Sequence, residues 1–246
     1  MNAMKTFLTL GLCLLILGGI AGYLGYSDYS FSNQEPHDAN TMKLEDYSKG
    51  QRIDTEVEYA YDYYAFMESY NTFLGIKTTK SREEERYYLV PITKVSETDG
   101  YTYIDYFMTF IVPANQCDKF DELVQYFWGN VETASKATFT GKVEAMNSDT
   151  RDLLIEYFNE DFNSEENPGV SEYQYLIEMN MFEGENIDTE YINSRLADYC
   201  IRFRADNSST TGLIIMSVGA VVFAAGAIFI IIAVLKKKKE SEPSFY

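Results

Sequence analysis

Histidine, cysteine and tryptophan are scarce in this chain. Its 246 residues include one His (His37), three Cys and one Trp. A single His leaves Ser/His/Asp and Cys/His catalytic arrangements without their base, and zinc sites without their usual ligands. The GxSxG, GxGxxG and GxxxxGK[ST] patterns are absent, which argues against nucleophile-elbow hydrolases and glycine-rich phosphate loops. We therefore expect no catalytic residue, no cofactor and no metal site.

Basic residues are also few compared with acidic ones. The chain has 20 Lys and Arg against 38 Asp and Glu, a formal net charge of −18. Five of the lysines and two of the glutamates lie outside residues 27–211, so this interval holds 15 basic and 36 acidic residues and a charge of −21. Such a surface repels nucleic acid and attracts cations or basic partners. We expect no nucleic-acid role.

Aromatic residues are abundant, with 21 Tyr and 16 Phe. Disorder, the other interpretation of a high net charge, requires few aromatic residues, so we expect this interval to fold as one compact domain. Most of the tyrosine suits strands, where the ring packs while the hydroxyl reaches water. The alternative is that surface tyrosines with acidic neighbours form a face that binds protein or glycan.

Two long hydrophobic runs lie near the ends of the chain. Residues 7–26 contain no charge, and residues 212–235 are rich in Ile, Val and Ala. As helices, both runs are long enough to cross a hydrocarbon core of about 30 Å. We predict two transmembrane helices in a lipid bilayer, and hence a cell-membrane location.

Lysines flank both runs on the side of the chain ends. Because short lysine-rich segments stay cytoplasmic, we predict that the tails, residues 1–6 and 236–246, are cytoplasmic and that the central domain is extracytoplasmic. The alternative for the first run is a cleaved signal peptide with a cleavage site at Gly19-Ile20-Ala21, but the run continues past that site. The lysines concerned are Lys5, Lys236, Lys237, Lys238 and Lys239.

Small residues in the two runs are spaced for close helix packing. Gly18 and Gly22 stand four residues apart and are followed by Gly25, while the second run offers Ala220 and Ala224. We predict that this glycine region meets the second helix or a second copy of the chain, which would give a homo-oligomer. The alternative is that membrane helices are simply rich in small residues.

Between the runs we expect an α+β fold, a mainly antiparallel sheet with helices on one face, over residues 44–205. Residues 27–43 read as a linker and residues 206–211 as a flexible stalk. The turn signal Asp99-Gly100 predicts a hairpin between the second and third strands. Strands are predicted over residues 53–66, 86–93, 101–112 and 138–146. Helices are predicted over residues 115–128, 149–162 and 189–199, whereas residues 172–182 fit either structure.

The domain contains two cysteines, on the side of the membrane where disulfides persist. We predict that a bridge, if one exists, joins Cys117 to Cys200 and leaves Cys13 free. The alternative is a pair of buried thiols, because separation in sequence says nothing about separation in space.

The acidic residues show no catalytic pattern. Glu83-Glu84-Glu85 and the alternating Asp54, Glu56 and Glu58 read as solvated surface. Residues 161–165 resemble the start of a calcium loop, but Glu166 stands where the sharp turn needs Gly. Neither pattern predicts a specific site.

The layout as a whole resembles a known kind of protein. A hydrophobic N-terminal run, a domain with the strand YYLVPIT at residues 87–93 and a C-terminal run ending in KKKK are similar to small two-pass bacterial membrane proteins of unknown function. The resemblance brings no catalytic or binding residue. We expect a non-catalytic binding or assembly role at the cell envelope, with a basic protein or envelope component as partner. The alternative is a carboxylate-dependent enzyme acting on an envelope polymer, which needs two carboxylates about 5 to 9.5 Å apart in one cleft.

Overall fold

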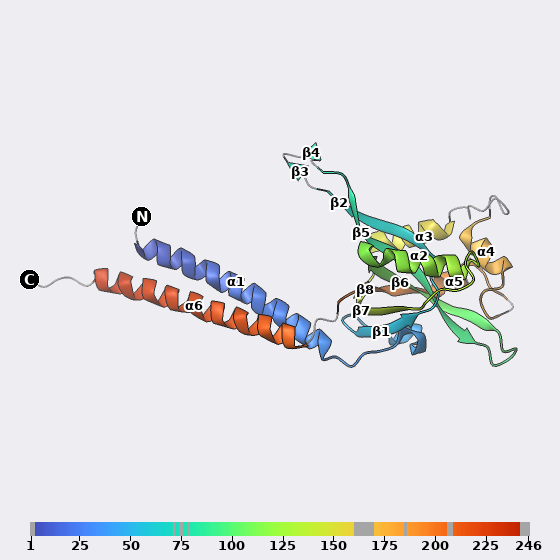
Figure 1. Ribbon diagram of the computed structural model, residues 1–246, viewed down its shortest axis with the longest axis horizontal. Coiled ribbons are helices and arrows are strands. Elements are labelled where there is room, and N and C mark those ends of the chain that lie inside the picture. The colour runs from blue at the N-terminus through green and yellow to red at the C-terminus, as the bar shows by residue number, and fades with distance from the viewer. Residues whose placement is uncertain are drawn as a thin grey trace, which may run out of the picture. The chain divides into compact units, whose positions relative to one another are not determined.

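The chain folds as two compact units in the computed structural model (Figure 1). The terminal unit comprises residues 1–35 and 206–246, and the central unit comprises residues 36–205. The structure describes residues 3–70, 72–73, 76–77, 79–159, 170–184, 186–205 and 209–241.

Two long helices, α1 (Ala3–Ser32) and α6 (Ser209–Ser241), make up the terminal unit. Both are long and apolar enough to cross a membrane, and most of their side chains are exposed, unlike those of a core helix in a soluble protein. Both extend beyond the predicted spans. In particular, residues 27–32, predicted to begin a linker, continue α1.

Glycines that recur every seven residues bring α1 and α6 into backbone contact. A Cβ atom built on any of them would lie less than 3.0 Å from backbone atoms of the other helix, closer than real Cβ atoms come. All six are buried. A period of seven keeps one face of each helix against its partner, and the missing side chains allow close approach. The glycines are Gly11, Gly18 and Gly25 on α1 and Gly212, Gly219 and Gly226 on α6.

The predicted packing residues need a correction. Gly18 and Gly25 lie in the interface, but a Cβ on Gly22 would point into open space, and Ala220 and Ala224 are exposed. Gly22 contributes only its backbone, against Gly219. The contacts follow the spacing of seven and not the spacing of four.

A six-stranded sheet with the order β1-β7-β8-β6-β5-β2 forms the middle of the central unit. Neighbouring strands are antiparallel, except that β6 and β8 are parallel, so the mainly antiparallel α+β fold is confirmed. The strands are β1 (Arg52–Val57), β2 (Asp62–Ser69), β5 (Arg82–Val95), β6 (Thr102–Pro113), β7 (Ala137–Ala145) and β8 (Leu196–Phe203). Two short strands, β3 (Thr72–Phe73) and β4 (Ile76–Lys77), pair with each other.

The β5–β6 hairpin confirms the sequence prediction. The strands predicted over residues 86–93 and 101–112 fall in β5 and β6, and the turn contains Gly100 at φ +75°, a left-handed conformation that suits glycine. The strand predicted over residues 138–146 is β7.

Residues 53–66 form two strands instead of the single strand predicted. β1 and β2 lie at opposite edges of the sheet, joined by residues 58–61, of which Ala60 and Tyr61 are fully buried. Five residues span at most about 18 Å, whereas five strand spacings in a flat sheet span about 24 Å. The sheet must therefore coil enough to bring its two edges together at this connection.

The predicted helix at residues 189–199 is correct only in its first half. Helix α5 (Thr189–Ser194) ends there, and the chain then enters the central strand β8. Hydrogen-bonding partners on both sides, β6 and β7, override the helical spacing of the apolar residues.

Helices pack on both faces of the sheet, whereas one covered face was expected. Helix α2 (Cys117–Phe127), preceded by the 3-10 turn η3 (Ala114–Gln116), places Phe120 and Leu123 against Tyr88 and Met108. Helices α3 (Ser148–Asn159), α4 (Glu172–Glu178) and α5 pack with Leu89 and Phe107, the alternate residues of the same strands. Residues 172–182, left open by the sequence, thus begin with a helix. Residues 160–162 of the predicted second helix lie outside the described residues.

Residues 36–43 belong to the domain and are not a linker as predicted. The amide of His37 donates to the carbonyl of Arg52 (3.0 Å), and the amide of Asp54 donates to the carbonyl of His37 (2.9 Å). The 3-10 turns η1 (Ala39–Thr41) and η2 (Leu44–Asp46) follow, with Ala39 fully buried. The segment covers the free edge of β1. Of the predicted stalk, residues 206–208 lie outside the described residues, and α6 begins at Ser209.

Candidate functional site

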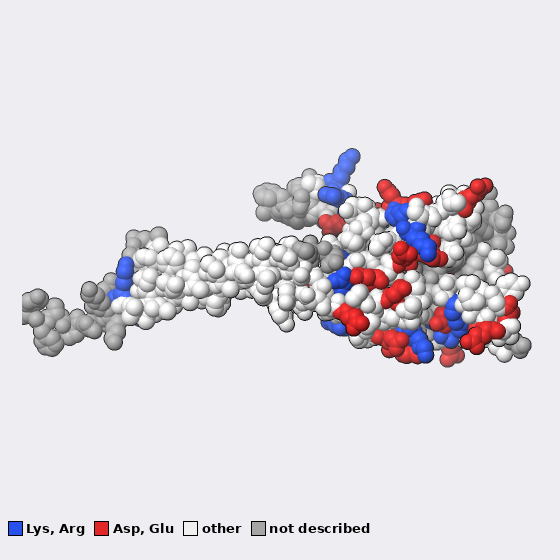
Figure 2. All heavy atoms as spheres, turned by 60° about the horizontal axis from the view of Figure 1, so that its bottom comes forward, with Lys and Arg blue, Asp and Glu red and all other residues white. Residues whose placement is uncertain are grey.

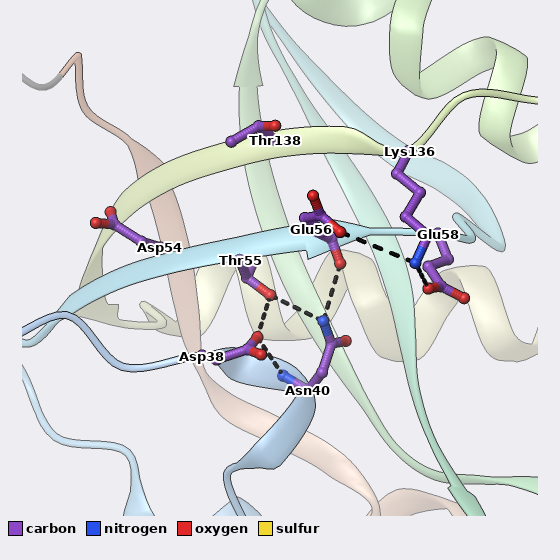
Figure 3. Close-up of a pocket in the computed structure, with 8 residues that line it drawn as sticks. All are labelled: Asp38, Asn40, Asp54, Thr55, Glu56, Glu58, Lys136 and Thr138. Atoms are coloured by element: carbon purple, nitrogen blue, oxygen red, sulfur yellow. Dashed lines mark hydrogen bonds and ion pairs between the residues drawn. The ribbon is translucent and has the colours of Figure 1, made fainter.

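A pocket of about 480 Å³ lies beside the edge strand β1 (Figure 3). Four of its eight lining side chains are carboxylates and one is a lysine, so we call it the acidic pocket. It is lined by Asp38, Asn40, Asp54, Thr55, Glu56, Glu58, Lys136 and Thr138.

Three segments far apart in the sequence build the acidic pocket. Asp54 and Glu56 project from β1, where the alternation predicted a solvated face, and Glu58 follows that strand. Asp38 comes from the segment that covers the β1 edge, and Lys136 directly precedes β7, which pairs with β1. Sequence reasoning missed Asp38, Asn40 and Lys136 because only these backbone pairings bring them to the strand.

A hydrogen-bond network holds the floor of the acidic pocket. Asp38 Oδ1 accepts from the hydroxyl of Thr55 (2.6 Å) and from the amide of Asn40 (3.1 Å). The side-chain amide of Asn40 donates to Thr55 Oγ1 (3.0 Å) and to the carbonyl of Glu56 (2.9 Å), as Figure 3 shows. The network fixes Asp38 in place, so its carboxylate is oriented before any ligand arrives.

The acidic pocket keeps a negative charge after its ion pairs are counted. Lys136 pairs with Glu58 and lies 3.9 Å from Glu56, and Arg52 pairs with Asp54 at 2.7 Å. Four carboxylates against these two cations leave a formal charge of −2. The pocket therefore suits an ammonium or guanidinium group. No cluster of three or more His, Cys, Asp or Glu among the described residues is arranged to hold a metal ion.

A second hollow of about 520 Å³, which we call the aromatic groove, lies elsewhere on the same unit. The rings of Trp128 and Tyr175 lie 5.6 Å apart in it, and the indole nitrogen of Trp128 donates to the carbonyl of Tyr61 (2.8 Å). It is lined by Tyr59, Thr93, Thr102, Tyr103, Ile104, Phe127, Trp128, Tyr175, Met179 and Met181. Aromatic rings with a few hydroxyl groups are typical of sites for apolar side chains or sugars.

Consecutive residues line the two hollows, Glu58 the acidic pocket and Tyr59 the aromatic groove. The ring of Tyr59 stacks on that of Tyr126 with centroids 5.7 Å apart and planes 5° apart. Burial raises the pKa of Tyr59; Tyr126 and Glu58 add to the rise and Lys136 opposes it. The charges of the acidic pocket thus act on a ring of the groove. In Figure 2 further acidic side chains spread over the visible face of this unit, with Lys and Arg among them.

A pair of carboxylates lies apart from both hollows. Glu172, at the start of α4, is buried and accepts a hydrogen bond from the hydroxyl of Tyr61. Burial raises the pKa of Glu172 to about 7; the charge of Asp62 adds to the rise, and hydrogen bonds from Tyr61 and Tyr157 oppose it. The hydroxyl of Tyr157 also lies 3.2 Å from Asp62 Oδ2. The sequence contained no signal for this pair, since its members come from β2 and α4.

No bridge joins Cys117 to Cys200, so the alternative that the sequence left open, a pair of buried thiols, is confirmed. Cys117 and Cys200 are both free and buried. Cys117 packs on the α2 side of the sheet with Ile201, whereas Cys200, the residue before Ile201 on β8, points to the opposite face. The sheet therefore separates the two thiols. Cys13 is free, as predicted.

The lysines that flank the helices gather at one end of the helix pair, seen in blue in Figure 2. Lys5 lies in the first turns of α1, and Lys236 Nζ, near the end of α6, lies 4.5 Å from the ring centre of Phe7. The side chains of Lys238 and Lys239 lie outside the described residues. The same is true of residues 161–165, which resemble the start of a calcium loop.

A scan against protein-family models gives no match to this chain, and a search of curated proteins gives no similar sequence.

Proposed function

We propose that α1 and α6 anchor the chain in the cell membrane as a two-helix hairpin, with both termini cytoplasmic and the central domain extracytoplasmic. The presence of Lys5 and Lys236 at one end of the two apolar spans supports this orientation. The domain then has a non-catalytic binding or assembly role at the cell envelope.

The observation that carries this proposal is that consecutive residues, Glu58 and Tyr59, line the acidic pocket and the aromatic groove respectively. A partner with a Lys or Arg side chain beside an aromatic or long aliphatic one would place its charge in the acidic pocket and its apolar group in the groove. The partner we propose is therefore a basic protein or peptide of the envelope.

The two hollows would contribute differently to binding. The carboxylates of Glu56 and Glu58 are about half exposed, and such ion pairs contribute about 1 kcal/mol or less each. Burying one aromatic side chain contributes about 1.5 to 3 kcal/mol. The groove would supply most of the affinity, while the acidic pocket would set the association rate, the choice of a basic partner and the dependence on salt.

A pull-down from envelope extracts with the full-length protein in detergent tests the proposal. Recovery of the partner should fall as salt rises from about 50 to 500 mM, over which the screening length falls from about 14 to 4 Å. The double variant Glu56→Gln with Glu58→Gln should lose the salt-sensitive part of binding. The control is Glu156→Gln with Glu190→Gln, which removes two exposed charges that line neither hollow. Binding that ignores salt, or that both double variants reduce equally, would contradict the proposal.

The carboxylate-dependent enzyme is the alternative hypothesis, motivated by Glu172 beside Asp62. It predicts that the purified protein releases soluble fragments from an envelope polymer and that Glu172→Gln abolishes this release. The binding proposal predicts no release by either protein.

A further inference from the structure

The hydroxyl of Tyr157 on α3 is shared by two carboxylates. It lies 3.2 Å from Asp62 Oδ2 and also forms a hydrogen bond with Glu172, the buried residue at the start of α4. Glu172 Oε2 accepts a further hydrogen bond from the hydroxyl of Tyr61. A hydroxyl carries one proton, so Tyr157 can donate to only one of the two carboxylates at a time.

The number of protons in this network favours a protonated Glu172. In that state Glu172 donates to the oxygen of Tyr157, Tyr157 donates to Asp62, and each hydroxyl has a partner. If Glu172 is ionised, two negative charges share the one proton of Tyr157. Asp62 holds its charge more readily, because the amide of Tyr63 donates to its Oδ1 (2.7 Å). Glu172 is therefore the member of the pair that changes its charge.

The groups that act on Glu172 include no Lys, Arg or His among the described residues. They are Tyr61 from the connection between β1 and β2, Asp62 from β2 and Tyr157 from α3. Behind them, Tyr175 of α4 acts on Tyr61, and Asp121 of α2 acts on Asp62. Because no cation offsets the buried charge, burial together with Asp62 raises the pKa of Glu172 to about 7. Its ionisation thus falls near neutral pH.

Tyr61 connects Glu172 to the aromatic groove. Its hydroxyl donates to Glu172, its carbonyl accepts from the indole nitrogen of Trp128 (2.8 Å), and its ring lies 5.1 Å from that of Trp128. Helix α4 makes a second connection, because Tyr175 follows one turn after Glu172 and its ring lies 5.6 Å from that of Trp128. The geometry of the groove around Trp128 therefore depends on where the first turn of α4 lies.

The rest of α4 is held independently of Glu172. The ring of Tyr173 packs 5.1 Å from that of Phe158 on α3, and Leu176 is fully buried. A movement of the first turn can therefore occur while the helix stays attached to the domain. A shift that exposes Glu172 to water would return its pKa from about 7 to 4.5, so ionisation can favour the shifted position by at most about 300-fold.

We propose that Glu172 is a pH switch that controls the shape of the aromatic groove. Protonated, it holds the first turn of α4 against Tyr61 and keeps Tyr175 beside Trp128. Ionised next to Asp62, it moves toward water, and the groove loses the wall that Tyr175 provides. The consequence for binding rests on the proposed function of the groove: the basic partner should bind more tightly at pH 5.5 than at pH 8.

Acrylamide quenching of Trp128, the only tryptophan of the chain, tests the switch in the full-length protein in detergent. Quenching should increase several-fold as the pH rises from 5.5 to 8, with a midpoint near 7. Glu172→Gln should remove this response, and Asp62→Asn should move the midpoint to lower pH because it removes the neighbouring charge. Two controls should respond like the parent. Glu178→Gln changes the exposed end of α4, and His37→Gln removes the only histidine, the residue type that most often responds to pH in this range.

Quenching that ignores pH in the parent, or that depends on pH equally in Glu172→Gln, would overturn the inference. So would a loss of far-ultraviolet circular dichroism in step with the quenching, because it would report unfolding of the whole domain. If Glu172→Gln does not fold, Asp62→Asn decides, and an unchanged midpoint contradicts the switch. The quenching measurement needs no partner. A parent that responds to pH but recovers no basic protein in the pull-down at pH 5.5 therefore contradicts the proposed function and supports the switch.

Discussion

Gly18 and Gly219 form a reciprocal pair across the two long helices. A Cβ built on Gly18 would lie 2.7 Å from the carbonyl oxygen of Gly219, and one built on Gly219 would lie 2.9 Å from that of Gly18. The pairs Gly11 with Gly226 and Gly25 with Gly212 repeat this relationship. A glycine hydrogen that points at a carbonyl oxygen in this way forms a Cα–H···O contact, worth about 0.5 to 1 kcal/mol. The three pairs lock the helices in one antiparallel register.

Leucine at Gly18 should therefore break the helix hairpin, whereas leucine at Gly22 should be tolerated. At Gly18 the side chain would meet the backbone of Gly219 and Phe223, but at Gly22 it would project into open space. Cysteines replacing Phe7 and Phe229, whose rings stack 5.8 Å apart, provide the measurement in a Cys13→Ser background. Oxidative crosslinking should join the helices in the parent and in Gly22→Leu, and should drop several-fold in Gly18→Leu. Equal crosslinking in both leucine variants would refute the register.

The sequence predicted the helix pair correctly, except for which residues of the two helices face each other. Length and composition predicted both helices, and glycine was expected at their contact. The repeat of seven in residues 11, 18 and 25, matched by residues 212, 219 and 226, is visible in the printed sequence. The prediction used the spacing of four between Gly18 and Gly22, and Gly22 does not face α6 as Gly18 does. Only a period of seven returns to the same face along the whole length of two packed helices.

Glu172 should make the domain less stable as the pH rises toward neutrality. Its pKa is raised by burial from 4.5 to about 7. The folded state therefore holds a proton that the unfolded state releases between pH 4.5 and 7. The stabilisation from this group is fully present below pH 4.5 and is lost as the pH rises through 7, a change of about 3 kcal/mol. Denaturant unfolding in detergent, followed by Trp128 fluorescence, measures it.

Glutamine at position 172 supplies the test of that assignment. Glu172→Gln cannot ionise, so the fall in unfolding free energy between pH 5 and pH 7.5 should shrink by most of that amount. Glu178→Gln, at the exposed end of the same helix, should leave the pH dependence unchanged. A pH profile that is the same in Glu172→Gln and the parent would show that another group is responsible.

Cys117 and Cys200 should resist alkylation in the folded protein. Burial raises the pKa of both thiols, that of Cys200 to about 11, so only about one Cys200 in a thousand is a thiolate at pH 8. Mass spectrometry under non-reducing conditions should find no bridge, with both residues alkylated quickly only after unfolding. A mass two units lower, or protection from alkylation that persists after unfolding, would show that the disulfide forms after all.

The sequence predicted the local secondary structure of the domain better than it predicted which distant segments lie next to one another. The β5–β6 hairpin and α2 follow from turn chemistry and apolar periodicity over adjacent residues. The break between Val57 and Asp62 is hidden because Tyr59 and Tyr61 suit a strand as well as a connection. The acidic pocket could not be predicted for a different reason. Asp38 and Lys136 lie near Glu56 only because distant segments pair as strands, and no local sequence pattern encodes that pairing.

The orientation of the chain gives the last prediction: both termini should be cytoplasmic. Lys5 lies near the start of α1, and Lys236 packs on Phe7 at the same end of the helix pair, so one end of the hairpin carries a lysine from each helix. Short lysine-rich segments are retained in the cytoplasm, so we expect the connected domain outside. In intact cells, a membrane-impermeant thiol reagent should therefore label Thr98→Cys but not Asn2→Cys until the membrane is opened. Replacing Lys5 and Lys236 to Lys239 with Gln should allow both orientations, giving partial labelling at each site, whereas Glu156→Gln should change nothing. External labelling of residue 2, or a mature chain that begins near Gly22 because the first segment is cleaved, would show that α1 does not hold the N-terminus inside.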